Sequence, residues 1–462
     1  MKTSVATKSC LALVVAAAAA RGLAEAGAAP TSSGDFAVLS MNVAGLPEFL
    51  NGNGESGNKT TNTLLIGQAF ARHGWDVIHV QEDFNYHAGL YAADNHMSRT
   101  STSGGAGLGS GLNTLANLNW VDFSRVKWDA CSDASENDCL TPKGFTFMRV
   151  AVATSNTTSV YVDFYNLHAD AGTMPGDEVA RNANINQVAS YIATRSVGNA
   201  VVVFGDTNSR YTRTADTAIV SLLASANSSG PRLTDAWLEL QRGGVVPTVE
   251  SLCSNPSPND TCEVVDKVFY RSGPLVNLKA TQFHYVGHMF LDQNGSALSD
   301  HDPVQVNMTW SAGATLQQSD FWGGPHGDWF SDVPTLAAAP DNSTKLKVTA
   351  LKFRGGERLD SVGLTLADGT RFTHGGTGGD EVALTLGASE AWTQAKLCKG
   401  EYKEHTRNFY IRATTSAGNR LEAGTATDDC TTFTAPDRWQ IVGFLGQHGD
   451  EMDQLAFVYA PQ

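Results

Sequence analysis

The chain has 462 residues, of which 17% are charged and 42% are hydrophobic. This length allows more than one domain with a core of its own, and the hydrophobic fraction excludes an intrinsically disordered chain. The formal net charge is −15, from 32 basic and 47 acidic side chains. Proteins that bind nucleic acid through its phosphates normally carry an excess of Lys and Arg, so this charge disfavours a nucleic-acid partner, although a local basic groove can lie within an acidic total.

Residues 1–26 have the pattern of a secretory signal. Lys2 and Lys8 precede a ten-residue apolar run at 11–20, and Ala24-Glu25-Ala26 offers a cleavage site between small residues. The run is shorter than the roughly 20 residues that a helix needs to span a bilayer, and no later segment reaches that length. We therefore expect a secreted, extracellular protein without a transmembrane segment.

Six cysteines follow this signal, and they form three close pairs along the chain. Six cysteines allow about 15 pairings, of which the economical one joins Cys131 to Cys139, Cys253 to Cys262 and Cys398 to Cys430. No CxxC or HxxxH spacing accompanies them, so a zinc site is the weaker interpretation. Seven N-x-S/T sequons occur, at Asn58, Asn156, Asn227, Asn259, Asn294, Asn307 and Asn342. Together these features are typical of a glycosylated, secreted eukaryotic protein.

The segment 35–310 mixes strand-like and helix-like patterns. Helical periodicity is found at 63–73 and 178–195, and the Gly-rich segment 103–111 is expected to form a loop near the site. Strand-like runs are expected at 36–43, 76–81, 145–153, 159–167, 200–204, 264–270 and 303–310. Strands interspersed with helices predict a layered α/β domain.

The composition and the hydrophobic pattern of the sequence change after Trp310. Residues 311–318 carry little charge and few large apolar side chains, which indicates a linker. Beyond it, residues 319–462 show short alternating runs separated by Gly- and Asp-rich turns, with almost no helical periodicity. The second domain is therefore expected to be all-β.

Polar side chains stand at the ends of the hydrophobic runs of the first domain. In chain order they are Asn42, Glu82, His168 and Asp170, Asp206 and Asn208, Asp266, and Asp300 with His301. Such groups can bind a hard divalent cation, position a water and neutralise a phosphate without a nucleophilic serine or cysteine. Structural alternatives exist for single positions, namely a turn amide at Asn42, a surface salt bridge at Glu82, a structural histidine at His168 and an Asx turn at Asp206.

We assign roles to the first of these groups from their chemistry. Glu82 is expected to hold Mg2+, with Mn2+ or another divalent cation as the alternative, and Asn42 to contact the metal or the phosphate. Asp206 can align and deprotonate a water that the Asn208 amide holds.

The two histidines complete the predicted site. His168 and Asp170 are two positions apart, so on an extended segment they share one side and could form a proton-donating pair. Asp300 is expected to fix the tautomer of His301, which then contacts the scissile phosphate. Asp266 is expected to play a supporting part.

These motifs, in this order, resemble those of the endonuclease/exonuclease/phosphatase superfamily over roughly residues 35–310. GDTN at 205–208 resembles its GDxN motif, SDH at 299–301 its SDH motif, and VDKVF at 265–269 its D-x-(V/I)-F/L strand. The resemblance implies an α/β fold of the deoxyribonuclease I type, a four-layer β-sandwich flanked by helices. It also implies Mg2+-dependent cleavage of a phosphate ester by in-line attack of an activated water.

Three segments resemble secreted neutral sphingomyelinases more narrowly: LSMNVAGLP, CSDASENDCLTPKGFTFMRV and NLHADAG. Two departures are the HADAG segment, where HLxAxD is usual, and the lack of an obvious aromatic hairpin for membrane insertion. The candidate substrates are, in falling order, sphingomyelin, another phosphodiester lipid, an inositol phosphate and a nucleic acid. A lipid substrate implies peripheral contact with a membrane.

Residues 319–462 resemble a jacalin-type lectin, a β-prism of three short sheets. The resemblance rests on DFWGGPHGDWFSDV, LADGTRFTHGGTGGDE and WQIVGFLGQHGDEMDQLAFVYAP. It implies a carbohydrate-binding G-x-x-x-D loop formed by Gly449, Asp450, Glu451, Met452 and Asp453, with Gly324 or Gly323 beside it. The alternatives are a β-prism that binds no sugar and, for the whole chain, a non-catalytic secreted lectin, which the intact set of motifs disfavours.

Overall fold

The computed structural model describes residues 32–47, 57–135, 137–223, 232–339 and 346–462. The predicted signal at 1–26 and the sequons at Asn227 and Asn342 lie outside these ranges. None of the helices in the described ranges is both long and apolar enough to cross a membrane.

The first domain is built on two sheets. One has six strands in the order β11 (Val276–Tyr285), β12 (Val304–Ala312), β1 (Ser33–Asn42), β2 (Val77–Gln81), β4 (Asn113–Ala116) and β3 (Ser98–Arg99). The other contains β5 (Asn119–Lys127), β6 (Gly144–Thr154), β7 (Ser159–His168), β8 (Ala200–Asp206), β10 (Asp266–Arg271) and β9 (Thr234–Asp235). They pack face to face, with the His79 and Phe204 rings stacked at 3.6 Å and the Phe36 and Phe164 rings at 5.7 Å.

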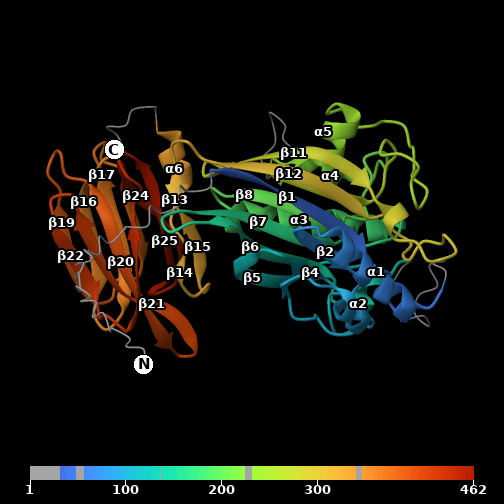
Figure 1. Ribbon diagram of the computed structural model, residues 1–462, viewed down its shortest axis with the longest axis horizontal. Coiled ribbons are helices and arrows are strands. Elements are labelled where there is room, and N and C mark those ends of the chain that lie inside the picture. Colours follow the sequence, from blue (N-terminus) through green and yellow to red (C-terminus); the bar gives the residue numbers. More distant parts are fainter. Residues whose placement is uncertain (1–31, 48–56, 136, 224–231, 340–345) are drawn as a thin grey trace, which may run out of the picture.

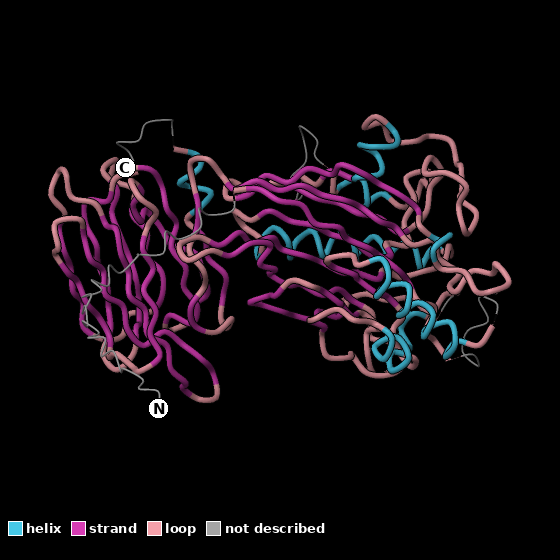
Figure 2. Tube along the Cα trace, viewed as in Figure 1, coloured by secondary structure: helices cyan, strands magenta, loops and turns pink. Residues whose placement is uncertain are grey.

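Helices cover the outer faces of this sandwich (Figure 2). α1 (Lys59–His73) packs Ile66 and Phe70 onto the first sheet, and α3 (Pro175–Arg195) packs Ile185, Val188 and Ile192 onto the second. Shorter helices are α2 (His87–Ala93), α4 (Thr217–Ser221) and α5 (Ala236–Arg242). These layers confirm the predicted α/β four-layer sandwich flanked by helices.

The predicted helices and strands of this domain are all present, but five strands were not predicted, namely β3, β4, β5, β9 and β11. β11 alternates buried and exposed residues, a pattern that sequence inspection could have found. In β5 only Asp122 is buried, so this strand lacks the alternation of buried apolar and exposed polar residues that identifies a strand in a sequence.

The second domain is a β-prism of three sheets, as predicted. One sheet orders β18 (Arg371–Gly375), β17 (Leu359–Leu366), β16 (Val348–Gly355) and β19 (Asp380–Thr385), and the next orders β22 (Arg420–Gly424), β21 (His405–Thr415), β20 (Trp392–Tyr402) and β23 (Asp429–Thr434). The third contains β14 (Trp322–Gly323), β15 (Asp328–Ser331), β24 (Trp439–His448) and β25 (Met452–Pro461). The buried Trp392 packs between the sheets against Phe353, Phe444 and Phe457. One short helix, α6 (Val333–Ala338), departs from the all-β expectation.

All three economical disulfides are formed. Cys131 is bonded to Cys139, Cys253 to Cys262 and Cys398 to Cys430. The first two close short loops of the first domain, and the third links β20 to β23 in the β-prism.

The two domains share one continuous sheet (Figure 1). Half of the segment 311–318, predicted as a linker, is in strands: its first two residues end β12 and its last two form β13 (Gln317–Gln318). β13 pairs with β25 of the prism on one side and with Ser159 of β7 on the other. The segment between the domains therefore contains a strand of the shared sheet.

Buried charges reinforce this junction. The guanidinium of Arg149, a fully buried residue, donates to both oxygens of Asp163 at 2.8 and 3.0 Å and lies 3.6 Å from the ring centroid of Trp329 in the prism. Nearby, Asp122 accepts hydrogen bonds from Arg195 at 2.7 Å and from Gln447 of the prism at 2.9 Å. Buried charges need such partners, because removing one partner leaves the other uncompensated.

We predict that Arg149→Met lowers the free energy of unfolding by about 3 kcal/mol, because Asp163 loses its buried counter-ion. The matched control is Arg354→Met: Arg354 pairs with Glu381 at 3.2 Å at the surface, and its loss should cost less than about 1 kcal/mol. Urea denaturation followed by tryptophan fluorescence measures both. Equal losses, or separate unfolding transitions for the two domains of the unmodified protein, would contradict this account of the junction.

Candidate active site

The strand directions bring the predicted polar residues to one end of the sandwich. β1 and β2 are parallel, as are β7 and β8, so within each pair the carboxyl ends lie at the same edge. β10 runs antiparallel to β8 and places Asp266 opposite Asp206, and β12 runs antiparallel to β1 and places Val304 opposite Ser40. The segment that precedes β12, with the SDH motif, therefore reaches the same end. This end points away from the β-prism (Figure 1).

Asn42 links two carboxylates at this end. Its Nδ2 donates to Glu82 Oε1 at 3.1 Å and to Asp206 Oδ2 at 3.3 Å. Its Oδ1 accepts from the backbone N–H of Ala44 at 3.0 Å, so the amide oxygen is turned away from the carboxylates. Asn42 therefore bridges the two carboxylates through its amide nitrogen. To bind a metal ion, as predicted, it would have to present its amide oxygen instead.

Glu82 is held in a strained conformation with one oxygen uncompensated. Its φ is +56°, which a residue with a side chain rarely adopts outside functional sites. Burial raises the pKa of its carboxyl group, while the charge of Lys143 and the hydrogen bond from Asn42 act in the opposite direction. Within the described residues, its buried Oε2 has no hydrogen-bond partner. A buried carboxylate oxygen of this kind fits a divalent cation.

Asp206 is the focal point of the site. Its Oδ1 accepts from the backbone N–H of Asn208 at 2.9 Å, the turn that was the structural alternative for this motif. Its Oδ2 faces the pocket, 3.4 Å from His168 Nε2 and 3.7 Å from His301 Nε2. Burial raises the pKa of Asp206 to about 6 against the charge of His301, which lowers it. One carboxylate thus both closes the turn and serves the pocket.

His168 is buried and neutral. Burial lowers its pKa well below the usual range, and the charges of Lys143 and His301 act in the same direction. Its Nε2 faces Asp206 and also lies 4.0 Å from Glu82 Oε1, while its Nδ1 has no hydrogen-bond partner among the described residues.

The predicted pair of His168 and Asp170 is wrong. β7 ends at His168, so the alternation of an extended strand does not continue to Asp170. Asp170 Oδ2 accepts from the backbone N–H of Ser132 at 2.8 Å, and its own N–H donates to Asn184 at 2.9 Å. Its carboxyl group therefore supports the Cys131–Cys139 loop.

Asp266, and not Asp300, orients His301. His301 Nδ1 lies 2.7 Å from Asp266 Oδ2, while Asp300 Oδ1 accepts only a long 3.4 Å bond from Ser299 Oγ. Although burial acts to lower the pKa of His301, the charges of Asp266 and Asp206 outweigh it and raise the pKa well above its usual range. The predicted role of Asp300 is thus corrected, because sheet register and not sequence adjacency brings the carboxylate to the imidazole.

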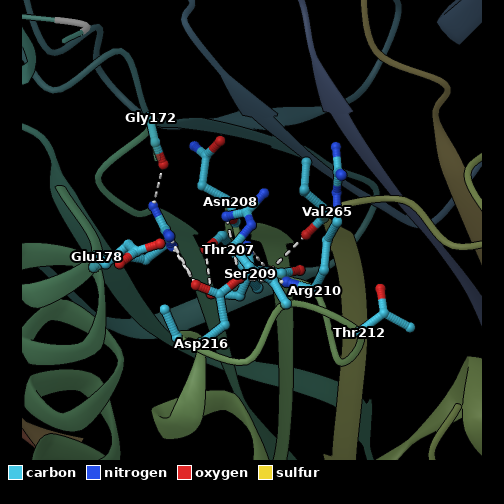
Figure 3. Close-up of polar contacts among 12 residues, drawn as sticks. Gly172, Glu178, Thr207, Asn208, Ser209, Arg210, Thr212, Asp216 and Val265 are labelled. Carbon is cyan, nitrogen blue, oxygen red and sulfur yellow. Dashed lines mark hydrogen bonds and ion pairs between the residues drawn. The ribbon is translucent and has the colours of Figure 1, made fainter. Parts of the chain in front are cut away.

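The Asn208 loop is anchored from beneath (Figure 3). Thr207 Oγ1 donates to the Val265 carbonyl at 2.6 Å, and the backbone N–H of Arg210 donates to Asp216 Oδ2 at 2.8 Å. The other oxygen of Asp216 accepts two bonds from Arg181, at 2.9 and 2.7 Å. Asn208 itself has φ +48°, and its Nδ2 donates to the Ala169 carbonyl at 3.1 Å. The amide expected to hold a water is therefore a fixed part of this loop.

Lys143 was not predicted as a site residue. It precedes β6, forms an ion pair with Asp138, and is 11% exposed. Its charge acts on the pKa values of Glu82, His168 and Asp206. The K-G-F sequence was the one available signal, and it does not by itself tell on which side of the strand the lysine lies.

The donor set fits a cation at Glu82 better than at His301. Ligand atoms of Asp206, Asp266 and His301 lie within 4.8 Å of one another, a spacing that could hold a metal ion. However, a protonated imidazole between two carboxylates already compensates their charge and offers no lone pair. A cavity of about 230 Å³ opens at Asp300 and His301 and includes Arg210, so an anionic group has room beside this cation.

The predicted sugar loop lies between β24 and β25, and its side chains are already engaged. Glu451 accepts from Arg358 at 2.7 to 2.9 Å, and the guanidinium of Arg358 stacks 3.8 Å above the Tyr402 ring. The side chain of Asp453 is 3% exposed and pairs with Arg407 at 3.3 Å.

The other members of this loop are placed as follows. Gly324 donates its N–H to the Asp453 carbonyl at 3.0 Å, so it does lie against the loop. Gly449 and Asp450 form the turn itself. Met452 is fully buried, so its side chain cannot contact a sugar, which corrects that assignment.

Comparison with known proteins divides the chain into the same two domains as the fold does. Residues 55–251 match the model of Endonuclease/Exonuclease/phosphatase family 2, and residues 319–458 match that of the Jacalin-like lectin domain. Sphingomyelinases of Mycobacterium bovis and Mycobacterium tuberculosis are 35% identical to the chain over 289 residues. That alignment covers 61% of the chain and 54% of each relative, so the chain spans about half the length of these relatives.

Solved structures are similar at lower identity. A beta toxin from Staphylococcus aureus is 15% identical, with a TM-score of 0.41 over 59% of the chain and 99% of the toxin chain. A mannose-binding jacalin-related lectin from Ananas comosus is 17% identical, with a TM-score of 0.28 over 32% of the chain and 99% of the lectin. The two family matches divide the chain as the fold does: residues 55–251 are similar to endonuclease/exonuclease/phosphatase family 2, and residues 319–458 are similar to the jacalin-like lectin domain.

Proposed function

We propose that the protein is a secreted, Mg2+-dependent phosphodiesterase that hydrolyses a phospholipid of the sphingomyelin type. The observation that carries this proposal is the buried Asp206 carboxylate, which lies 3.4 Å from His168 Nε2 and 3.7 Å from His301 Nε2 and is joined through Asn42 to Glu82. The 35% identity to sphingomyelinases over 289 residues supports the substrate class. The signal-like N-terminus and three disulfides support secretion.

The reaction follows from the charge states of the side chains. Asp206, as a carboxylate, takes a proton from a water held near Asn208, and the water oxygen bonds to phosphorus while the bond to the lipid oxygen breaks. The Nε2–H of His301, fixed by Asp266, gives its proton to the leaving oxygen. Asp206 then returns a proton to His301 across the 3.7 Å that separate them.

Other groups stabilise the charge that develops on the phosphate. His301 lines the pocket and Lys143 acts on its carboxylates through charge, and such preorganised charges usually supply the largest share of a rate enhancement. Mg2+ at Glu82 would offset the negative charge of the phosphate and of the leaving oxygen. The neutral His168 holds Asp206 from the other side.

We propose that the second domain binds carbohydrate at the turn of residues 449–453. Backbone N–H groups of this turn and the side chain of Asp450 are the groups it can offer, since Glu451 and Asp453 are covered by arginines. The intact site in the first domain supports an enzyme with an attached lectin-like module over a lectin alone.

The decisive experiment compares substrates with and without metal. Purified protein should release phosphocholine from sphingomyelin liposomes in Mg2+, lose at least about 100-fold activity in EDTA, and recover when Mg2+ is restored. Plasmid DNA should stay intact, since the net charge is −15. Glu82→Gln should raise the Mg2+ concentration for half-maximal activity, whereas Glu357→Gln, at a 91% exposed side chain, should not. Cleavage of DNA, or turnover that EDTA leaves unchanged, would refute the proposal.

We predict that Asp266→Asn costs far more activity than Asp300→Asn. Because Asp266 fixes and charges His301, its loss should lower kcat by about 100-fold or more, by analogy with other carboxylate–histidine pairs. Asp300→Asn should cost less than about 10-fold, since Asp300 acts on His301 only through its charge. Steady-state kinetics on sphingomyelin measures both, and the reverse order would show that the SDH aspartate orients the imidazole.

We predict an acidic limb in the pH profile at about pH 6, set by Asp206. Asp206 must be ionised to accept a proton, so kcat/KM should rise about 10-fold per pH unit below this value and level off above it. His301 must be protonated, and the charges of Asp266 and Asp206 favour this form by raising its pKa well above the usual range. The measurement is kcat/KM at constant ionic strength. Values that stay constant within about 10% from pH 5 to pH 7 would exclude Asp206 as the base.

A further inference from the structure

Exposed apolar side chains gather around the candidate active site. Ten large hydrophobic residues in the described ranges are exposed, all in the first domain, and five of them lie on loops at its catalytic end. Leu108, Leu140 and Met174 are 84%, 63% and 51% exposed, and Val249 and Leu252 are 77% and 47% exposed. We call these five residues the apolar rim. Scattered exposed apolar residues are ordinary, but a cluster around a site marks an interaction surface.

One side of the apolar rim adjoins Glu82 and His168. Leu108 belongs to the Gly-rich loop whose Gly111 carbonyl accepts from the N–H next to Glu82, and Met174 follows the segment that leaves His168. Leu140 lies three residues before Lys143. A Cβ placed on Gly107 would lie 3.7 Å from the carbonyl oxygen of Leu140, so the loop that carries Leu108 is in contact with the segment that carries Leu140.

These loops are held rigidly. The disulfide between Cys131 and Cys139 closes the loop that carries Leu140. Asp177 accepts from Ser135 Oγ at 2.5 Å and from the backbone N–H of Met174 at 3.1 Å, which ties that loop to the start of α3. These contacts fix the backbone that carries Leu140 and Met174, whose side chains are exposed.

The other side of the apolar rim adjoins His301. Leu252 lines the same 230 Å³ cavity as Asp300 and His301, and the disulfide of the neighbouring Cys253 with Cys262 closes its loop. Glu250, between Val249 and Leu252, pairs with Arg210 of that cavity at 3.1 Å. Apolar side chains thus flank the polar pocket on both sides.

We propose that the apolar rim docks the enzyme on a zwitterionic phospholipid bilayer, an inference that rests on the proposed function because the pocket it surrounds must face a lipid headgroup. A polar pocket framed by apolar side chains matches the layering of a bilayer surface, with headgroups outside and acyl chains beneath. The net charge of −15 opposes an anionic surface, which leaves a zwitterionic one as the matching partner. The rim side chains would enter the interface while the phosphate enters the pocket.

Vesicle flotation in EDTA tests docking separately from turnover. The full chain, mixed with phosphatidylcholine vesicles, should float with them, and added anionic lipid should not increase the bound fraction. Leu108→Asp combined with Leu140→Asp should lower the partition coefficient about 10-fold or more, since two apolar side chains no longer enter the interface. Leu108→Trp should raise it a few-fold, because indole favours the headgroup region.

Met97→Asp is the matched control. Met97 is 80% exposed but precedes β3, whose Ser98 pairs with Ala116 opposite Val77, at the end of the sheet remote from the site. This variant should bind vesicles as the unmodified protein does. Thermal unfolding of every variant should match the unmodified protein, because exposed positions contribute little to stability.

The outcomes separate the two proposals. Failure of the unmodified chain to float, binding of the double variant equal to that of the unmodified chain, or an equal loss in Met97→Asp would each overturn the apolar rim as a lipid-docking surface. Flotation that depends on the rim, without hydrolysis of sphingomyelin in Mg2+, would uphold the rim and refute the proposed reaction. Capture of a protein partner by the rim in place of vesicles would also overturn the lipid assignment.

Discussion

The buried carboxylate of Asp206 is the constraint around which the first domain is organised. A charge at 1% exposure has to be compensated, and the compensating side chains come from three separate segments of the chain. Asn42 and His168 end strands of opposite sheets, and His301 arrives from the turn before β12. The same groups that satisfy this charge are those that a phosphate ester would meet, so folding and chemistry depend on one cluster.

Local backbone strain marks the same place. Ala44, Glu82 and Asn208 all have positive φ, and each lies one or two residues after the end of a strand at this edge. Asparagine tolerates this conformation, but alanine and glutamate do so at a cost. The stability of the surrounding sheets must offset this strain. A stable sandwich with a fixed strand register is therefore a precondition for the site.

The shared sheet changes how the two domains are understood. Because β13 pairs with strands of both domains and Arg149 is buried between them, the prism is held in a fixed orientation at the end of the sandwich opposite the catalytic pocket (Figure 1). The apolar rim and the turn at 449–453 therefore lie on different parts of one rigid body. A surface that offers both lipid and glycan would have to meet each part separately.

Much of this architecture was determined by local sequence. The strand-end polar residues, the two long helices, the disulfide pairs and the β-rich second domain follow from patterns within short segments, because burial on one face and loop closure are local properties. Tertiary structure alone decided that Asp266 orients His301, that Asp170 turns to Ser132, that the charge of Lys143 acts on Glu82 and that β13 joins strands of both domains. Those outcomes depend on contacts between segments far apart in the chain, and a segment carries no record of which partner will lie beside it.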